Sequence, residues 1–574
     1  MDPIPQTFSL GEASTAVRER IAQLDASKFP ERLWARDTSL WGDDPEHRKV
    51  AANRLGWLGS PAAMREQVAQ LEAFAREVRE DGYTHAVLLG MGGSSLAPEV
   101  LRLTFGVRHG ALDVSVLDST SPAAVRAVDE SSDPEKTLFI VSSKSGGTIE
   151  VSSFERHFWN AMVAAVGAAN AGRHFIAITD PGTALERLAK ERGYRRTFTN
   201  PPDIGGRYSA LSYFGMVPAA LLGIDVTAVL ERALEEATAS CNASTGGTLP
   251  SGFVLGAALG ELAKRGRDKL TLVLGSEVEA FASWVEQLVA ESTGKNGKGI
   301  VPVADEPLAA PEFYGVDRVF VAFSVEPLPA ATETALEVLA AAGHPVLRWR
   351  LRDRASIGEE FLRWEIATAT ASAILEVDPF DEPNVTEAKQ ATQAVLERDR
   401  AGAAAHGGDR SVHLEVPARD RARLTAAMNG RTDPASWAAA LLTLARPGDY
   451  FAVLAYLHRT PELHERLQRL RLAARAGTRV ATTLGYGPRF LHSTGQLHKG
   501  GPDTGIFLQL TADEGPDLPV PDAPYSFGQL IRAQAAGDYE VLERRGRRVV
   551  HMHLGTEPGA ALDEIIEALA AVRV

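Results

Sequence analysis

The sequence predicts an α/β protein built from two tandem three-layer αβα sandwich domains with parallel sheets, plus helical N-terminal and C-terminal extensions. Two observations support this fold class. From residue 84 onward, short β-rich runs alternate with amphipathic segments, and the alternation recurs after residue 269. Alternation of this kind builds a parallel sheet with helices on both faces. A chain of 574 residues is also too long for one ordinary hydrophobic core, so several domains are expected.

The first sixty residues predict a helical N-terminal segment, and residues 61–235 predict the first sandwich. Its strands and helices follow from the alternating runs: strands at His85–Gly90, Asp113–Leu117, Thr137–Ser142 and His174–Thr179, and helices at Pro98–Phe105, Pro122–Asp129, Thr148–Met162 and Thr183–Arg192. Each strand ends in a polar turn ahead of its helix, as βαβ units require.

Residues 236–425 predict the second sandwich, after a segment rich in Ser, Thr, Gly and Ala at Thr238–Gly252. We place its strands and main helix at Lys269–Leu274, Arg318–Phe323, Pro345–Arg350 and Glu277–Glu291. Residues 398–412, rich in Ala, Gly and charge, predict a loop. Residues 426–574 predict a helical and strand region, with helices at Trp437–Ala445, Tyr450–Leu457, Pro461–Ala474 and Ala560–Val572 and strands at Arg479–Leu484 and Gly505–Leu510.

The composition excludes several classes of protein. A formal net charge of −14 favours solubility and argues against a nucleic-acid or membrane-surface partner. The single cysteine, Cys241, excludes an intramolecular disulfide and a Cys-based metal site. The amino terminus lacks the pattern of a signal peptide, and no apolar run approaches the ~18–20 residues of a membrane span. We therefore expect a cytoplasmic protein.

The first glycine-rich turn, Gly90-Met91-Gly92-Gly93-Ser94-Ser95, lies between the first predicted strand and a helix. Glycines such as Gly92 and Gly93 let the backbone approach a ligand, and free N–H groups at a helix start attract anions. Ser94 and Ser95 add hydroxyl donors. The turn therefore predicts a phosphate site, with a purely structural turn as the alternative.

Dinucleotide binding is the rival functional interpretation of this turn. Gly90-x-Gly92 opens a Gly-x-Gly-x-x-Gly pattern, and Asp118 ends the next strand about where a ribose would lie. However, Ser95 occupies the third glycine position, which disfavours this interpretation. A Walker A loop is excluded because no Gly-Lys-Ser/Thr follows.

The second turn, Ser142-Ser143-Lys144-Ser145-Gly146-Gly147-Thr148, again lies between a strand and a helix. Four hydroxyls and one ammonium in seven residues are costly to bury unless an anion satisfies them. Helix capping explains one or two of the hydroxyls. It does not explain Lys144 at the carboxyl end of a parallel strand, where open α/β sheets bind ligands. This turn predicts phosphate binding.

Two later segments carry groups suited to proton transfer. In Gly205-Gly206-Arg207-Tyr208-Ser209, the glycine pair presents Arg207 from a tight turn, where a guanidinium could stabilise an enediolate. A surface arginine is the alternative. Gln287 lies one helical turn before Glu291, so both project from one face of the predicted helix. A carboxylate at a helix end could move a proton between adjacent sugar carbons, with an ordinary helix-surface charge as the alternative.

In order and spacing, these motifs resemble the glucose-6-phosphate isomerase family, whose members are built from two sugar-isomerase (SIS) domains. The matching segments are the Gly-x-Gly-Gly-Ser turn at 90–94, Ser143-Lys144-Ser145-Gly146-Gly147-Thr148, Gly-Gly-Arg-Tyr-Ser at 205–209 and Glu-Ser-x-Gly-Lys at 291–295. The chain looks closest to the isomerase half of bifunctional transaldolase/phosphoglucose isomerases, on Trp41-Gly42-Asp43-Asp44-Pro45 and Asn53-Arg54-Leu55-Gly56-Trp57-Leu58. No transaldolase barrel precedes these segments, so we expect no transaldolase activity.

The resemblance implies a role for each matching residue. It implies phosphate binding by Ser94, Ser143, Ser145 and Thr148, with Lys144 nearby and with the turn glycines Gly92, Gly93 and Gly206 among the binding residues. It also implies that Arg207 stabilises the enediolate, Gln287 touches the sugar and Glu291 is the base. The implied chemistry is metal-free, without a cofactor, and proceeds by ring opening and then proton transfer through a cis-enediol.

The sequence departs from the family in the groups for ring opening. Family members carry a histidine some twenty to thirty residues after the base, often lent by a second subunit, but none occurs here between Glu291 and His344. The family's carboxyl-terminal Gln-x-Gly-Val-Glu-x-x-Lys segment is also missing. In its place, residues 490–502 carry His492, His498 and Lys499 on a glycine-rich turn. We expect Lys499 and His498 to open the ring, with His492 as substitute; a structural loop or a zinc site are the alternatives.

Three functions remain open from sequence. The first is an aldose–ketose isomerase acting on glucose 6-phosphate and fructose 6-phosphate. The second is a non-catalytic sugar-phosphate-binding SIS protein, and the third is an NAD-dependent oxidoreductase resting on Gly90-x-Gly92 and Asp118. The expected partner is a small-molecule sugar phosphate, without nucleic acid or membrane, and the protein is expected to be a monomer or homodimer.

Overall fold

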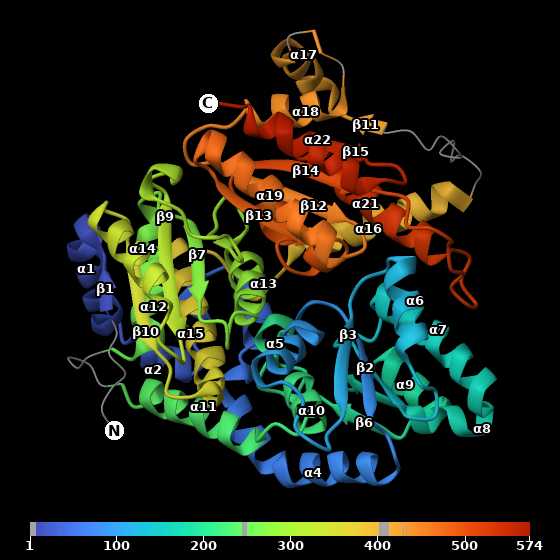
Figure 1. Ribbon diagram of the computed structural model, residues 1–574. Coiled ribbons are helices and arrows are strands. Elements are labelled where there is room, and N and C mark those ends of the chain that lie inside the picture. Colours follow the sequence, from blue (N-terminus) through green and yellow to red (C-terminus); the bar gives the residue numbers. More distant parts are fainter. Residues whose placement is uncertain (1–6, 244–248, 401–412, 429, 432, 574) are drawn as a thin grey trace.

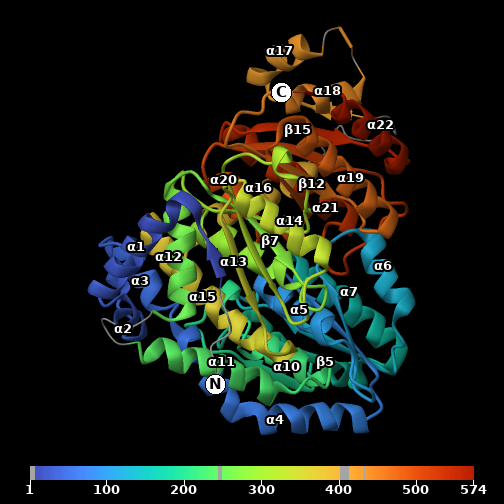
Figure 2. The same ribbon diagram turned by 60° about the vertical axis from the view of Figure 1, so that its left-hand side comes forward.

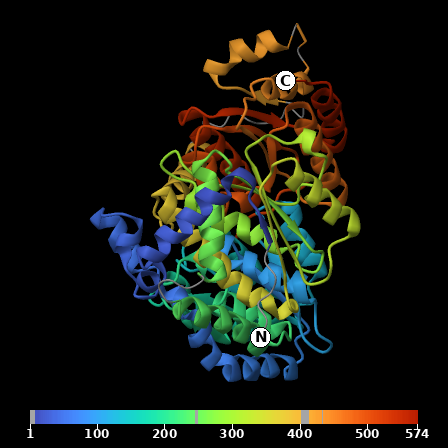
Figure 3. The same ribbon diagram turned by 90° about the vertical axis from the view of Figure 1, so that its left-hand side faces the viewer.

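The computed structural model describes residues 7–243, 249–400, 413–428, 430–431 and 433–573. These residues form three α/β units, each with one five-stranded sheet. In Figures 1, 2 and 3 the third unit lies above the other two, which sit side by side beneath it. The mixed α/β class with parallel sheets, predicted from strand–helix alternation, is confirmed.

The first sheet has the strand order β3-β2-β4-β5-β6 and is entirely parallel. Its elements are α4 (Ser60–Glu80), β2 (His85–Gly90), η4 (Gly92–Ser94), α5 (Leu96–Phe105), β3 (Asp113–Leu117), α6 (Pro122–Ser131), β4 (Thr137–Ser142), α7 (Ile149–Val166), α8 (Ala168–Ala171), η5 (Gly172–His174), β5 (Phe175–Thr179), α9 (Ala184–Glu191), β6 (Arg196–Thr199), η6 (Gly206–Tyr208), α10 (Tyr213–Leu221) and α11 (Val226–Cys241). Successive strand residues enter different cores: Leu88 packs with α4 and α5, whereas Val87 and Leu89 pack with α7. The sheet is therefore covered on both faces.

The second sheet has the order β1-β10-β9-β7-β8, in which only β1 is antiparallel. Its elements are α12 (Ser251–Lys264), β7 (Lys269–Leu274), α13 (Phe281–Thr293), β8 (Val301–Val303), η7 (Pro311–Phe313), β9 (Arg318–Ser324), α14 (Ala330–Ala341), β10 (Val346–Arg350), η8 (Arg354–Ser356), α15 (Ile357–Leu375) and α16 (Pro383–Arg400).

The N-terminal segment adds an edge strand to this second sheet. Its elements are β1 (Thr7–Ser9), η1 (Gly11–Ala13), α1 (Ser14–Ala26), α2 (Phe29–Trp34), η2 (Thr38–Trp41), α3 (Pro45–Ala52) and η3 (Gly56–Gly59). Trp41 donates its indole N–H to the carbonyl of Ala369 on α15 at 2.9 Å. The segment is thus tied to a unit more than 200 residues further along the chain, which no local pattern reveals.

The third sheet was only partly foreseen from the sequence. It has the order β11-β15-β14-β12-β13, with only β11 antiparallel. The unit comprises β11 (His413–Glu415), α17 (Ala418–Ala427), α18 (Pro434–Leu442), β12 (Tyr450–Tyr456), α19 (Pro461–Thr478), β13 (Ala481–Tyr486), η9 (Arg489–His492), α20 (Gly495–Gly500), β14 (Gly505–Thr511), α21 (Phe527–Arg544), β15 (Arg548–His553) and α22 (Pro558–Ala570). What the sequence suggested as an extension is thus a complete sheet with helices.

The predicted helix at Tyr450–Leu457 is wrong, because this segment is the strand β12 between β14 and β13. Phe451 and Val453 enter one core of the third unit, and Ala452 and Leu454 enter the other. A strand buried on both faces reads as a continuous apolar run, which periodicity cannot distinguish from a buried helix.

The parallel strands of all three sheets are arranged in the same order relative to the chain. In chain order the first four parallel strands of each unit lie as second, first, third and fourth, so the chain reverses direction across the sheet beside the first strand. The reversals fall between β2 and β4, between β7 and β9, and between β12 and β14. Open α/β sheets bind ligands at the carboxyl ends of the strands at such a switch point.

Buried arginine–carboxylate clusters join the units in pairs. Arg207 of the first unit meets Glu291 of the second, Arg489 of the third meets Asp118 of the first, and Glu306 of the second meets Arg475 of the third. Helix α13 contacts α5, α15 and α20, so it touches all three units and lies near their common junction in Figure 1.

The domain limits predicted from sequence remain predictions. The limit at 235/236 falls inside α11 and that at 425/426 inside α17. Of the loop predicted at 398–412, residues 401–412 lie outside the described residues. Within the described part of the chain, no helix is long and apolar enough to cross a membrane.

Candidate active site

The two glycine-rich turns come together at the switch point of the first sheet. The turn at Gly90–Ser95 follows β2 and that at Ser142–Thr148 follows β4, and the two strands are paired neighbours. The Ser142 hydroxyl donates to the carbonyl of Ser94 at 3.2 Å, which links the turns directly. Both therefore present polar groups at the edge of the sheet where ligands bind.

Close backbone packing brings the arginine turn against the first glycine turn. A Cβ atom on Gly93 would lie 2.0 Å from the carbonyl oxygen of Gly206, so only glycine fits there. Gly92 has φ of +54°, and a Cβ there would lie 2.8 Å from the carbonyl oxygen of His492 and 2.9 Å from Nε2 of Gln287. The glycines in this turn therefore allow three other segments to approach it.

In the second turn the hydroxyls form a local network. Ser143 Oγ and Thr148 Oγ1 are 3.1 Å apart, and the backbone N–H groups of Gly146 and Gly147 donate to the hydroxyls of Ser143 and Ser145. This arrangement places several donors at the start of α7, where an anion is favoured.

Lys144 is not free in the structure. Its ammonium forms an ion pair with Asp180 and donates to the carbonyl of Pro202 at 3.0 Å. Burial raises the pKa of Asp180, and Lys144 opposes that shift. An arriving phosphate would therefore compete with Asp180 for the lysine.

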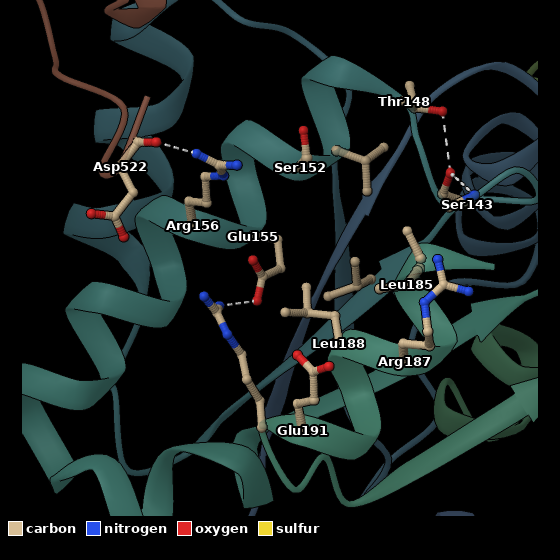
Figure 4. A pocket seen from close by; sticks show the side chains of 15 residues that line it. Ser143, Thr148, Ser152, Glu155, Arg156, Leu185, Arg187, Leu188, Glu191 and Asp522 are labelled. Atoms are coloured by element: carbon tan, nitrogen blue, oxygen red, sulfur yellow. Dashed lines mark hydrogen bonds and ion pairs between the residues drawn. The ribbon is translucent and has the colours of Figure 1, made fainter. Parts of the chain in front are cut away.

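A cavity of about 410 Å³ lies beside the second turn, between α7 and α9. Figure 4 shows Ser143 and Thr148 at one end of it, with Leu185, Leu188 and Glu155 further along its lining. Glu155 forms an ion pair with Arg192, another lining residue. Its lining includes none of Arg207, Gln287 and Glu291. The cavity thus adjoins the hydroxyl turn without containing the proton-transfer groups.

Helix α13 presents Gln287 and Glu291 on one face, as their spacing predicted. Gln287 Nε2 donates to Glu291 Oε2 at 3.2 Å and to the carbonyl of His492 at 2.8 Å. Both side chains are buried. The structure thus joins the predicted base to the first glycine turn and to the third unit through one amide.

Arg207 is held by contacts from two segments, the end of α13 and residues 379–382. Its NH1 lies 3.6 Å from Glu291 Oε2 and 3.1 Å from Glu382 Oε2. Its Nε donates to the Ser292 hydroxyl at 2.9 Å, and its NH2 donates to the carbonyl of Pro379. Glu382 and the carbonyls beside it went unnoticed in the sequence, because nothing near Pro379 signals a ligand of Arg207 some 170 residues away.

The electrostatics of Glu291 suit a general base. Burial raises the pKa of its carboxyl group; Arg207 opposes the shift and Glu382 adds to it. A carboxyl group whose pKa is raised toward neutrality accepts a proton more readily than an ordinary glutamate. Lys295 also lies near, but its ammonium is buried and donates to Asp381 Oδ1 at 2.5 Å.

The histidine nearest to these groups is His492, at the end of η9. Its Nε2 lies 2.9 Å from Glu150 Oε1, and Glu150 is buried in the first turn of α7. Burial acts to raise the pKa of Glu150, but His492 and other groups outweigh it and the pKa is lowered. Glu150 was missed in the sequence, although its place two residues after Thr148 in the phosphate turn is a signal that could have found it.

Lys499 and His498 lie inside the third unit. Lys499 Nζ is 2.6 Å from Asp538 Oδ1, and both side chains are about 1% exposed. The His498 ring packs among Tyr450, Phe490 and Phe507. Burial lowers the pKa of His498 well below its usual value. Their described contacts are thus with the third unit, whereas His492 meets the first and second.

The groups that suggested other ligands have partners in the structure. Asp118 accepts from the Ser95 hydroxyl at 3.4 Å and pairs with Arg489 NH1 at 3.2 Å. Among the described residues, no group of three or more His, Cys, Asp or Glu side chains is arranged to hold a metal ion.

Two phosphate-type turns at a switch point, with an arginine and a buried carboxylate beside them, define a phosphosugar isomerase built on SIS-type α/β units. Two solved structures share the fold. A hypothetical protein from Thermus thermophilus matches with a TM-score of 0.55 at 24% identity, covering 69% of this chain and 100% of that one. A glucose-6-phosphate isomerase from Chlamydia trachomatis matches with a TM-score of 0.55 at 14% identity, covering 69% and 88%.

Sequence comparison identifies the family. The family model described as phosphoglucose isomerase matches residues 62–303, which include both turns, Arg207 and Glu291. The glucose-6-phosphate isomerase of Rubrobacter xylanophilus is 30% identical over 393 residues, covering 60% of this chain and 89% of the relative. That of Carboxydothermus hydrogenoformans is 28% identical over 442 residues, covering 67% and 92%. The chain belongs to the phosphoglucose isomerase family of enzymes, as the resemblance of its motifs indicated.

Proposed function

We propose that this enzyme interconverts glucose 6-phosphate and fructose 6-phosphate, with Glu291 as the base. The observation that carries the proposal is the buried pair of Glu291 and Arg207, 3.6 Å apart, beside the turn at Gly92 and Gly93. A carboxylate and a guanidinium in one dry site can take a proton from carbon and stabilise the oxyanion that forms.

The proposed reaction starts with phosphate binding at the paired turns. The phosphate accepts hydrogen bonds from Ser94, Ser143, Ser145 and Thr148, and Lys144 turns from Asp180 toward it. The substrate then extends from the first sheet toward α13. Gln287, which already donates to Glu291 and to the His492 carbonyl, contacts the sugar hydroxyls.

Ring opening needs a group that gives a proton to the ring oxygen and one that takes a proton from the C1 hydroxyl. We propose that His492 makes both transfers in turn, taking the C1 hydroxyl proton and giving it to the ring oxygen, because it lies beside Gln287 and Gly92 and is oriented by Glu150. Lys499 and His498 have the right chemistry but are engaged within the third unit. Because His492 belongs to this chain, the proposed site needs no residue from a second copy, and a monomer would be competent.

Isomerisation then moves one proton between the two carbons and one between their oxygens. Glu291 removes the proton from C2 of open-chain glucose 6-phosphate, and the C1 carbonyl oxygen takes up negative charge as the cis-enediolate forms. Arg207 stabilises that oxygen. Glu291 returns the proton to C1 while the C2 hydroxyl proton moves to the C1 oxygen, which leaves the C2 ketone of fructose 6-phosphate. No metal or redox cofactor enters this balance.

The test separates the two halves of the reaction. Purified protein should convert fructose 6-phosphate to glucose 6-phosphate in the presence of EDTA. Glu291→Gln should lower kcat by about 10²–10⁴-fold, the usual contribution of general acid–base catalysis. The Glu291→Gln variant should still exchange the α and β anomers of glucose 6-phosphate, because this exchange requires ring opening but no proton transfer at carbon. Full activity of Glu291→Gln would refute the assignment of the base.

A non-catalytic sugar-phosphate-binding protein is the alternative that the same experiment detects. It would bind fructose 6-phosphate but show no turnover in the unmodified chain. That outcome would refute the proposed function and leave only the phosphate site.

A further inference from the structure

We propose that Gln534 is a positioning residue: its amide holds the Glu150 carboxylate, and through it the His492 imidazole, in the orientation that ring opening requires. The inference rests on the proposed function, because it concerns the step assigned there to His492. Gln534 lies on α21 of the third unit and is 1% exposed.

A continuous chain of hydrogen bonds carries the proposal. The Thr120 hydroxyl donates to Gln534 Oε1 at 2.7 Å, and Gln534 Nε2 donates to Glu150 Oε1 at 2.7 Å. The same Glu150 oxygen meets His492 Nε2 at 2.9 Å. Thr120 and Glu150 belong to the first unit, whereas Gln534 and His492 belong to the third, so the chain of hydrogen bonds crosses the interface three times.

The polarity of the chain is set by Glu150 together with Thr120. A threonine hydroxyl can donate to the carbonyl side of the amide, which leaves the NH₂ side to face Glu150. The reverse orientation would place the amide oxygen against a carboxylate oxygen, which is repulsive. Thr120 is completely buried, so no solvent competes for the amide oxygen. The carboxylate, which only accepts, therefore selects the orientation of the Gln534 amide, and the Thr120 hydroxyl supports it by donating to the amide oxygen.

The Gln534 amide acts on the His492 imidazole through the Glu150 carboxylate. The carboxylate oxygen accepts from both Gln534 Nε2 and His492 Nε2, so the neutral ring carries its hydrogen on Nε2. The other nitrogen, Nδ1, is then the one left to exchange a proton with substrate. A carboxylate that orients a histidine and selects its tautomer is a recurring device in general acid–base catalysis.

Packing alone does not account for a glutamine at this position. A buried amide costs free energy unless its donors and acceptor are satisfied, and an apolar residue would avoid that cost. Both ends of the Gln534 amide meet groups of the first unit. One helical turn further on, Asp538 pairs with Lys499, so this face of α21 contacts Lys499 directly and reaches His492 through Glu150.

The experiment measures ring opening by itself. Anomer exchange of ¹³C-labelled glucose 6-phosphate, followed by exchange NMR, reports that step, and kcat and KM report the whole reaction. Gln534→Met keeps the length of the side chain and removes its hydrogen bonds, and Thr120→Val removes the hydroxyl that orients it. Gln393→Met is the matched control, because Gln393 is exposed on α16 and donates to Glu397 within its own helix.

We expect Gln534→Met to slow anomer exchange by about 10- to 100-fold, the factor that loss of one hydrogen bond to a charged group corresponds to. Thr120→Val should have a smaller effect in the same direction. KM should change by less than about twofold, because no substrate contact is lost. In ¹⁵N-histidine-labelled protein, the His492 signal, assigned with His492→Gln, should lose its Nε2–H tautomer signature in Gln534→Met.

A third variant keeps the test decisive if Gln534→Met does not fold. Gln534→Glu places a second carboxylate against Glu150, and two adjacent carboxylates cannot both ionise readily. Protonated at low pH, the new carboxyl group reproduces the acceptor and donor of the amide. In Gln534→Glu, anomer exchange should therefore be slow at pH 8, and its rate relative to that of the unmodified chain should rise toward pH 5.5.

Two results would overturn the proposal. One is normal anomer exchange and an unchanged His492 tautomer in folded Gln534→Met and Thr120→Val. The other is a Gln534→Glu variant whose rate of anomer exchange, relative to that of the unmodified chain, is independent of pH. Failure of the proposed function looks different, because then the unmodified chain itself would show neither anomer exchange nor isomerisation.

Discussion

Arg489 joins the third unit to the first, and its removal tests how firmly the units are held. It is the first residue of η9, the turn that ends at His492. Its guanidinium forms an ion pair with Glu99 and lies 3.2 Å from Asp118 Oδ2. Burial acts to lower the pKa of Arg489, but Asp118 and Glu99 outweigh it and the pKa is raised. Arg489→Met would leave both carboxylates without their cation.

The expected loss of stability follows from the burial of these three groups. Removing one partner of a fully buried ion pair costs about 3–5 kcal/mol. The side chains of Arg489, Glu99 and Asp118 are 20%, 21% and 12% exposed. Some water therefore reaches the cluster, and we expect a loss of about 2–3 kcal/mol at pH 8. For a unit of this size, that corresponds to a decrease in Tm of roughly 4–12 °C.

The sign of the pH dependence is a stricter test. Without Arg489, burial raises the folded-state pKa of Glu99 and Asp118 above their unfolded values near 4. A carboxyl group with a raised folded pKa loses stability as pH rises from its unfolded to its folded value. The destabilisation should therefore be small near pH 4 and full at pH 8.

Thermal unfolding of the unmodified chain and Arg489→Met at pH 5 and pH 8 measures this difference. The triple variant with Glu99→Gln and Asp118→Asn is the control, because it removes the stranded charges and should recover part of the stability at pH 8. Anomer exchange should also slow in Arg489→Met, since His492 is three residues away. An equal loss of Tm at both pH values would refute the reasoning.

Two further predictions concern close packing and a second buried cluster. Gly93→Ala should abolish activity, because the new Cβ would lie 2.0 Å from the Gly206 carbonyl oxygen. Gly59→Ala is the control and should keep its activity, because the nearest atom to its Cβ would be 3.9 Å away. Steady-state kinetics of both variants would measure the difference. Burial acts to raise the pKa of the Glu306 carboxyl group, but three buried arginines outweigh it and lower this pKa to about 2, below the unfolded value near 4.3. Glu306→Gln should therefore destabilise by about 3 kcal/mol at pH 7, and by less as pH falls below about 4 toward 2, measured by thermal unfolding; an equal loss at pH 3 would contradict this.

Local sequence was sufficient for much of the fold. The strands at His85–Gly90, Asp113–Leu117, Thr137–Ser142 and Lys269–Leu274 form as predicted, because apolar runs bounded by polar turns and amphipathic helices leave few other structures. Tyr450–Leu457 was misread, since an apolar run buried on both faces carries no periodicity. The strands β1, β6, β8, β11 and β15 were missed. Of these, β1 and β11 are three-residue antiparallel edge strands that pair with distant segments.

The candidate site divides in the same way. The glycine turns, Arg207, Gln287 and Glu291 could be singled out because their chemistry is written in short motifs, and the structure brings them together. The partners Glu382 and Gln534 could not, because each acts across a contact between units that no local pattern encodes. For Glu150, the one local signal was its place two residues after Thr148.

The sequence by itself thus determined the α/β class, the phosphate-type turns and the residues suited to proton transfer, since these depend on local propensity and side-chain chemistry. Only the tertiary structure decided that residues 413–573 form a third sheet unit and that His492, rather than Lys499 or His498, lies beside Gln287 and Gly92. The reason is physical: whether a polar side chain faces a site or a buried partner depends on which units pack against it. Here Asp538 and an aromatic cluster engage Lys499 and His498, while Glu150 meets the ring of His492.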